Sequence, residues 1–158
     1  MSETSVRKSA FPLHVIVIGL HDRPGAAHSV ADVFSARGLQ MEAFQGTSDS
    51  LSPDGHAALL ILFRATPERA TLVTRVLRRL SSVRHAELID AGDPRLRLSV
   101  LVAAGPTPPS DIHLVSIDTQ TALAIGAPGN LLAWLQSDTA PARLGAVRLD
   151  VIDRQAGA

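Results

Sequence analysis

The sequence predicts an α+β protein with two successive units, each made of a sheet and helices, the second smaller than the first. Strand-like and helix-like periodicities alternate through the first ninety residues. A weaker copy of the same order follows, without its first helix. With 158 residues, of which 46% are hydrophobic and 19% charged, the chain is long enough to bury one core or two small ones.

The first strand and helix have the clearest pattern. Residues 14–20 form a continuous apolar and β-branched run, which is typical of a central strand. From Pro24 the apolar positions recur at helical spacing as far as Phe34, and Gly38 follows the last of them. Proline near the start and glycine past the end favour a helix of about four turns between them.

The rest of the first half adds four elements and completes a sandwich of six. They are, in order, a strand at 39–45, a strand at 57–63, a helix opened by Thr66 and Pro67, and a strand at 83–89. A turn at 48–55, rich in Ser, Asp, Pro and Gly, separates the first two of these strands. The two strands around the turn predict a hairpin. The order is therefore βαββαβ, which is a ferredoxin-like arrangement.

The second half repeats this order with one piece missing. Strands are expected at 96–104, 112–117, 122–126 and 147–152, with a short helix at 130–136. Residues 105–110, Gly-Pro-Thr-Pro-Pro-Ser, stand where the first helix should be and are too short and proline-rich to form one. We therefore expect a flexible tail at 1–12, a first domain at 13–91, and a truncated ferredoxin-like domain at 95–154.

Composition excludes several classes of protein. Fifteen basic and fifteen acidic residues cancel, so no overall field attracts the chain to nucleic acid or to an anionic membrane. The absence of cysteine excludes a disulfide framework, and an apolar run such as 15–20 is far shorter than the roughly 20 residues that span a bilayer. We expect a cytoplasmic protein with no direct nucleic-acid or membrane partner.

The candidate site is the corner Asp22-Arg23-Pro24-Gly25, between the first strand and the first helix. A strand that turns into a helix leaves amide groups of the first helical turn without partners, and these suit a carboxylate or phosphate. No thiol, tyrosine or cluster of metal ligands accompanies the corner. The expected ligand is therefore sensed rather than transformed, with no catalytic residue, no metal and no cofactor.

These residues resemble the ACT domain, a regulatory module that binds amino acids, and the resemblance covers residues 13–90. It is carried by Asp22-x-Pro24-Gly25, then Val30, Val33 and Phe34 on the helix, then Gly38-Leu39-Gln40-Met41. In size and pattern the whole chain resembles the regulatory small subunit of acetohydroxyacid synthase (acetolactate synthase). The missing helix of the second half departs from that family.

The resemblance implies a ligand-binding site made of Leu20, Asp22, Pro24, Gly25, Ala26, Ala27, Gln40 and Met41. Asp22 would take the ammonium group of an amino acid, and the amides of Gly25 and Ala26 would receive its carboxylate. Gln40 stands where many members have Asn and could also bond the ligand. The apolar lining by Leu20, Ala27 and Met41 suits valine, leucine or isoleucine.

Geometry predicts self-association. A sheet with both helices on one side leaves its other side bare, and the strand at 39–45 is expected at an edge with unpaired backbone groups. A two-fold dimer, or a higher oligomer, that pairs these edges would bring Gln40 to Phe44 of a second copy close to the Asp22 corner. The ligand would then select one arrangement of two chains, which is what allosteric control requires.

Each of these features also has a simpler, structural explanation. Asp22 and Pro24 can serve only to cap and start a helix. His21, His28 and Asp32 suggest a metal site but lack further ligands at suitable spacing. The arginines of the second helix, Arg69, Arg75, Arg78 and Arg79, are typical of a solvated face, and Trp134 is typical of a core or an interface.

Three functions are compatible with these residues. The first is a non-catalytic regulatory subunit that binds a branched-chain amino acid and controls a catalytic partner such as acetohydroxyacid synthase. The second is a regulator of gene expression with two ACT-type domains, acting through a protein partner. The third is a small enzyme with His21 or His85 as base and Asp22 as acid, although no histidine is linked by spacing to a nucleophile and an orienting carboxylate.

Overall fold

A computed structural model describes residues 11–48, 50 and 56–151. Most of the predicted tail (1–12), most of the predicted turn at 48–55, and the last three residues of the predicted second domain (152–154) lie outside the described residues. The chain divides into two compact units between Asp90 and Ala91. Each unit is described separately below.

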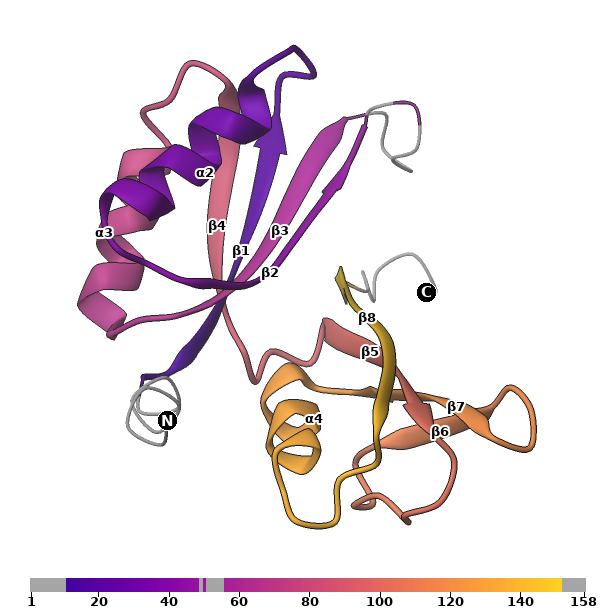
Figure 1. The fold of residues 1–158 in the computed structure, drawn as a ribbon. Coiled ribbons are helices and arrows are strands. Elements are labelled where there is room, and N and C mark those ends of the chain that lie inside the picture. The colour runs from indigo at the N-terminus through magenta and orange to yellow at the C-terminus, as the bar shows by residue number, and fades with distance from the viewer. Residues whose placement is uncertain (1–10, 49, 51–55, 152–158) are drawn as a thin grey trace. The chain divides into compact units, whose positions relative to one another are not determined.

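The first unit has four strands and two helices in βαββαβ order (Figure 1). They are β1 (Leu13–Leu20), α2 (Ala26–Ala36), β2 (Met41–Thr47), β3 (Ala57–Arg64), α3 (Pro67–Leu77) and β4 (Val83–Asp90). The strands form one antiparallel sheet in the order β2-β3-β1-β4. β1 is therefore a central strand, as its continuous apolar sequence predicts, and β2 lies at an edge.

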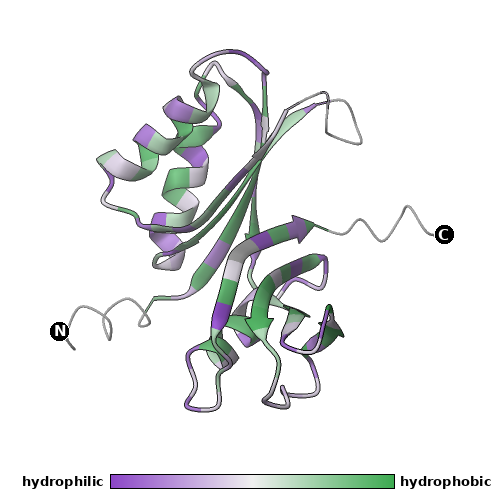
Figure 2. Cartoon of the chain, turned by 45° about the vertical axis from the view of Figure 1, so that its right-hand side comes forward, coloured by the Kyte–Doolittle hydropathy of each residue, from purple (hydrophilic) through white to green (hydrophobic). Residues whose placement is uncertain are grey.

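Both helices bury their apolar stripes against a shared core. Figure 2 shows the hydrophobic residues of the two helices on the side turned to the sheet. Phe34 of α2 is fully buried, and its ring meets that of Phe63 edge-on at 5.2 Å between centroids. Val30, Ala70, Val73 and Leu77 are likewise fully buried. The apolar residues that recur at helical spacing in the sequence are thus the residues that face the core.

The helix boundaries follow from local chemistry. Gly25 precedes α2 with φ 84° and ψ −7°, a left-handed conformation, so the helix begins at Ala26 rather than at Pro24. Gly38, with φ 61°, lies beyond its other end, where the Leu39 N–H donates to the Phe34 carbonyl at 3.0 Å. At the start of α3 the Thr66 hydroxyl accepts the Arg69 N–H at 3.3 Å, and Pro67 is the first helical residue.

The second unit has the same plan without the first helix. Its elements are β5 (Leu96–Ala103), β6 (His113–Ser116), β7 (Thr121–Gly126), α4 (Pro128–Leu135) and β8 (Arg143–Val151). The sheet order is β6-β7-β5-β8, so each strand takes the position of its counterpart in the first unit. Between β5 and β6 the described chain forms no helix, as the proline-rich stretch 105–110 predicts.

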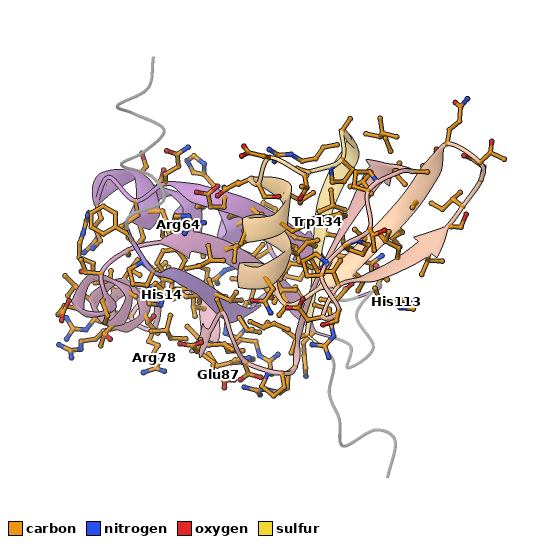
Figure 3. All side chains as sticks on the ribbon, turned by 90° about the horizontal axis from the view of Figure 1, so that it is seen from below. His14, Arg64, Arg78, Glu87, His113 and Trp134 are labelled. Carbon is orange, nitrogen blue, oxygen red and sulfur yellow. The ribbon has the colours of Figure 1, made fainter. Side chains whose placement is uncertain are left out.

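One face of this smaller sheet packs against α4. The alternate residues Leu96, Leu98, Val100 and Val102 of β5 are buried, as is Leu131 of α4. Trp134 extends from α4 toward the strands of this sheet and is only 5% exposed, so it is a core residue (Figure 3). The predicted α+β class, with a βαββαβ sheet followed by a smaller sheet and one helix, is confirmed.

Candidate functional site

The corner at residues 22–25 follows directly from the end of the central strand. β1 pairs with β3 on one side and β4 on the other, and Leu20, its last residue, is 6% exposed. The next residue, His21, donates its N–H to the carbonyl of Ser82 at 3.0 Å. Arg23 also reaches this turn, because its Nη2 donates to Ser81 Oγ at 3.3 Å. The corner is therefore attached to the turn that precedes β4.

Two hydrogen bonds shape the turn into α2. The Ala26 N–H donates to the Arg23 carbonyl at 3.2 Å, closing a tight turn through Pro24 and Gly25. The Gly25 carbonyl accepts both the N–H and the Oγ–H of Ser29, each at 3.0 Å. Because Gly25 has a positive φ, most side chains at this position would strain the backbone.

Three N–H groups of this turn donate no backbone hydrogen bond within the described part of the chain. They are the N–H groups of Gly25, Ala27 and His28. All three belong to the N-terminal end of α2, where the helix dipole is positive. The Ala26 N–H, expected to bind a carboxylate together with that of Gly25, already donates to the Arg23 carbonyl. The available amides on the helix itself are thus those of Ala27 and His28.

The side chains at the corner are mostly accessible. Asp22, Pro24, Gly25 and Ala27 are exposed, whereas Ala26 is buried at 5% exposure and belongs to the core cluster with Leu20. The corner therefore has an exposed carboxylate and exposed backbone next to apolar residues of the core.

Gln40 and Met41 do not lie near this corner in the same chain. Leu20 pairs with Ala57, at the beginning of β3, whereas Met41 pairs with Phe63, near the end of that strand. Six residues of extended strand separate the two positions, or about 20 Å. Gln40 is exposed, and Met41 packs at the margin of the core. Of the eight predicted site residues, one chain therefore brings together the six that lie between Leu20 and Ala27, but not Gln40 and Met41.

Two of the histidines considered as a base or as metal ligands, His28 and His85, have close neighbours within the first unit. His28 Nε2 lies 3.4 Å from Asp32 Oδ2 one turn along α2, and both side chains are well exposed. The His85 ring lies so close to Gly19 that a side chain on this glycine would collide with it. Among the residues that the structure describes, no group of three or more His, Cys, Asp or Glu side chains could hold a metal ion.

Arg23 is the contributor to this corner that sequence reasoning missed. It lies inside the quoted Asp-Arg-Pro-Gly stretch, but only the fold brings its guanidinium to Ser81. Two arginines of the predicted basic face have structural roles instead: Arg78 Nε donates to the Ala86 carbonyl at 2.8 Å, and Arg69 donates to the Arg37 carbonyl at the end of α2. Among the described residues, no helix is long and apolar enough to span a membrane.

Comparison with known proteins identifies the fold. No family model matches the sequence, and no curated protein is significantly similar to it. Among solved structures, the acetolactate synthase small subunit from Thermotoga maritima matches with a TM-score of 0.54 at 16% identity, over 88% of this chain and 93% of that one.

Two further matches have TM-scores below 0.5. The ACT domain of GTP pyrophosphokinase from Chlorobium tepidum matches at 0.41 and 20% identity, over 51% of this chain and 100% of that one. The ligand-free regulatory subunit of aspartate kinase from Thermus thermophilus matches at 0.42 and 16% identity, over 78% and 88%. These two carry no argument; the likeness to the acetolactate synthase small subunit, over most of the chain, shows an ACT-like α+β fold.

Proposed function

We propose that this chain is a non-catalytic regulatory protein that binds a small apolar amino acid at the Asp22–Ala27 corner and thereby modulates a partner enzyme. The observation that supports the proposal is the turn at Gly25, after which the N–H groups of Gly25, Ala27 and His28 have no backbone acceptor among the described residues. Amides at the N-terminal end of a helix bind carboxylates through hydrogen bonds and the helix dipole.

The other end of an amino acid has partners at the same corner. Asp22 follows the last residue of β1, and its carboxylate is the group expected to take the ligand's ammonium. The ligand side chain would lie toward Leu20 and Ala27, neither of which offers a polar group. This lining supports valine, leucine or isoleucine over a polar amino acid.

A second copy of the chain completes the site. β2 is an edge strand, and Phe44 at its centre is 42% exposed. An antiparallel two-fold pairing of β2 centred on Phe44 would place Met41 of one copy opposite Thr47 of the other. Thr47 lies at the end of the sheet where β1 runs into the corner, since both Thr47 and Gly19 pair with Ala58. Gln40 and Met41 would thus lie at the end of the neighbouring copy's sheet that carries its corner, and not at the corner's end of their own sheet.

The regulated partner is proposed from the whole-chain likeness. The matching structure from Thermotoga maritima is a small subunit of acetolactate synthase. We therefore infer a partner of the acetohydroxyacid synthase type, whose activity would change when the amino acid stabilises the dimer. Capture of the catalytic chain from a lysate, followed by assay with and without valine, tests this part separately.

A calorimetric screen of the twenty amino acids tests the site itself. We expect micromolar to millimolar affinity, or about −8 to −4 kcal/mol, for valine, leucine or isoleucine. The variant Gly25→Asp should weaken this binding at least about tenfold, because its carboxylate would compete for the same amides and repel that of the ligand.

Gly105→Asp is the matched control for this experiment. Gly105 also has a positive φ, 151°, has nothing within 4 Å of the place where a Cβ would stand, and lies in the second unit. The substitution thus adds the same charge at a position with positive φ that is not part of the proposed site. Equal loss of binding in both variants, or no heat with any amino acid, would reject the proposed site.

A further inference from the structure

The four edge strands described in the two sheets are not equally protected against pairing with another strand. Exposed edges are usually blunted by charged side chains or by bulges. β2 carries Glu42 and has a shift of register at Met41. β4 and β8 each carry three charged residues, and the ladder of each contains a register shift.

β6 has neither form of protection. No charged residue occurs from Ile112 to Ile117 apart from the titratable His113, and all four pairs between β6 and β7 follow a regular register. Val115 and Ile117 are 42% and 57% exposed. Of the edges that the structure describes, this short strand is therefore the one best suited to accept another strand.

The hydrogen bonds of the sheet show which backbone groups of β6 point outward. The Ile117 N–H donates to the Thr121 carbonyl at 3.0 Å, so Ile117 and, by alternation, Val115 and His113 bond to β7. The N–H and C=O groups of Leu114 and Ser116 consequently face away from the sheet. The N–H of Ile112, one step further, already donates to the Pro109 carbonyl at 3.0 Å.

Symmetry then selects one register for pairing with a second copy. A two-fold axis perpendicular to the sheet keeps each side chain on its own face, so the pairing must be centred on a residue. When the pairing is centred on Val115, Leu114 of each copy lies opposite Ser116 of the other. All the outward N–H and C=O groups of these residues then form hydrogen bonds between the copies. Centred on Leu114, it would need Ile112, whose N–H is occupied.

We propose that β6 is a self-association edge, at which β6 of a second copy pairs antiparallel with Val115 opposite Val115. The lack of acidic, lysine and arginine side chains from Ile112 to Ile117 supports a like strand as the occupant, because no two like charges within these runs would face each other. Val115 and Ile117 lie on the same face as Leu123, which pairs with Val115, so the second copy would extend an apolar row on that face. This edge lies in the second unit and does not depend on amino-acid binding.

Four residues a side form a small contact. Stable interfaces bury roughly 1,200–2,000 Å² in total, which one short strand pair does not reach. The association is therefore weak on its own and is best detected by a covalent trap. The chain suits such a trap because it contains no cysteine.

Val115→Cys in the full chain is the diagnostic variant. Residues opposite one another in a non-hydrogen-bonded antiparallel pair have Cα atoms about 4.5 Å apart, within the range that a disulfide spans. We expect mild oxidation at high protein concentration to convert most of this variant to a covalent dimer, read by non-reducing electrophoresis.

Ser116→Cys and Ile117→Cys are the matched controls. In the proposed register the thiol introduced at position 116 faces Leu114 of the other copy, and the two thiols introduced at position 117 lie about 13 Å apart along the strands. Both variants should form at least about tenfold less dimer than Val115→Cys. Equal cross-linking of the three variants would mean random collision, and no dimer from Val115→Cys would mean that β6 does not pair with itself; either result overturns the proposal.

Amide hydrogen exchange of the unmodified chain gives a second readout. The amides of Leu114 and Ser116 should become protected as protein concentration rises, and Val115→Lys should remove that protection by placing two ammonium groups opposite each other. Concentration-independent exchange at these two amides would also overturn the proposal.

Discussion

The first unit connects its first two strands through a helix, whereas the second connects the matching strands through a loop. In the first unit α2 lies beside α3, and both cover the sheet (Figure 1). In the second unit β5 is followed by the proline-rich stretch 105–110, yet the strand order is unchanged. The order of strands is therefore set by their pairing, and the first helix is not required for it.

The missing helix changes the surface that remains. Beside α4 lies an open hollow of about 380 Å³. It is lined by Pro109, Asp111, Asn130, Ala133, Trp134, Ser137 and Thr139. The second unit also lacks the corner that a strand-to-helix turn at its first strand would provide. The comparison therefore assigns to α2 the covering of part of the sheet, and in the proposed function the same helix also offers its N-terminal amides to the ligand.

The largest expected effect tests how far the first unit depends on α2. Phe34→Ala removes a fully buried ring that contacts Phe63, and such truncations cost about 3–5 kcal/mol. Urea denaturation followed by circular dichroism should show this loss. The chain's only tryptophan, Trp134, reports on the second unit, and its fluorescence transition should shift much less. A loss below about 1 kcal/mol would contradict the role given to α2.

A smaller effect compares the caps of α3 and α4. Thr66 and Ala127 have similar backbone angles before their helices, φ −64° and ψ 154° against φ −61° and ψ 140°. Of these two residues, only Thr66 has a side chain that accepts a hydrogen bond from the first turn of its helix. Thr66→Ala should cost about 1 kcal/mol, and Ala127→Thr should gain up to about that amount by supplying the same bond. Thermal denaturation measures both, and equal shifts in the same direction would count against this explanation.

The smallest effect concerns the turn between β6 and β7. The Gln120 N–H donates to Asp118 Oδ1 at 2.7 Å, and this hydrogen bond lowers the pKa of the exposed Asp118 carboxyl below its ordinary value. A lowered pKa stabilises the fold above the unfolded value of about 3.9, and that contribution is lost as pH falls through the folded pKa. Asp118→Asn should therefore slightly flatten the pH dependence of stability below about pH 4. If the stability of this variant depended on pH in the same way as that of the unmodified chain, the result would argue against this hydrogen bond.

The sequence predicted the elements but not all of their ends. Strand and helix periodicity were sufficient for the order in both units, because those patterns reflect which faces become buried. β8 begins at Arg143 rather than at the predicted Val147, since Arg143 pairs with Val102 and the Ala103 N–H donates to the Ala142 carbonyl. Such pairing between distant segments leaves no local signal. β2 likewise runs from Met41 to Thr47 instead of 39–45.

The site was predictable to a similar degree. The Pro-Gly corner is visible in the sequence, but the bond from the Ala26 N–H to the Arg23 carbonyl, and the contact of Arg23 with Ser81, depend on the turn geometry. The separation of Met41 from Leu20 depends on strand register, which no local pattern reveals. That separation makes a second copy essential to the proposed site.

Titration of the labelled protein with valine, followed by amide chemical shifts, tests the central proposal most directly. We expect the largest shifts at the N–H groups of Gly25, Ala27 and His28, with a second set at Gln40 and Met41 from the neighbouring copy. Saturating valine, leucine or isoleucine that left these five resonances unmoved would contradict the account.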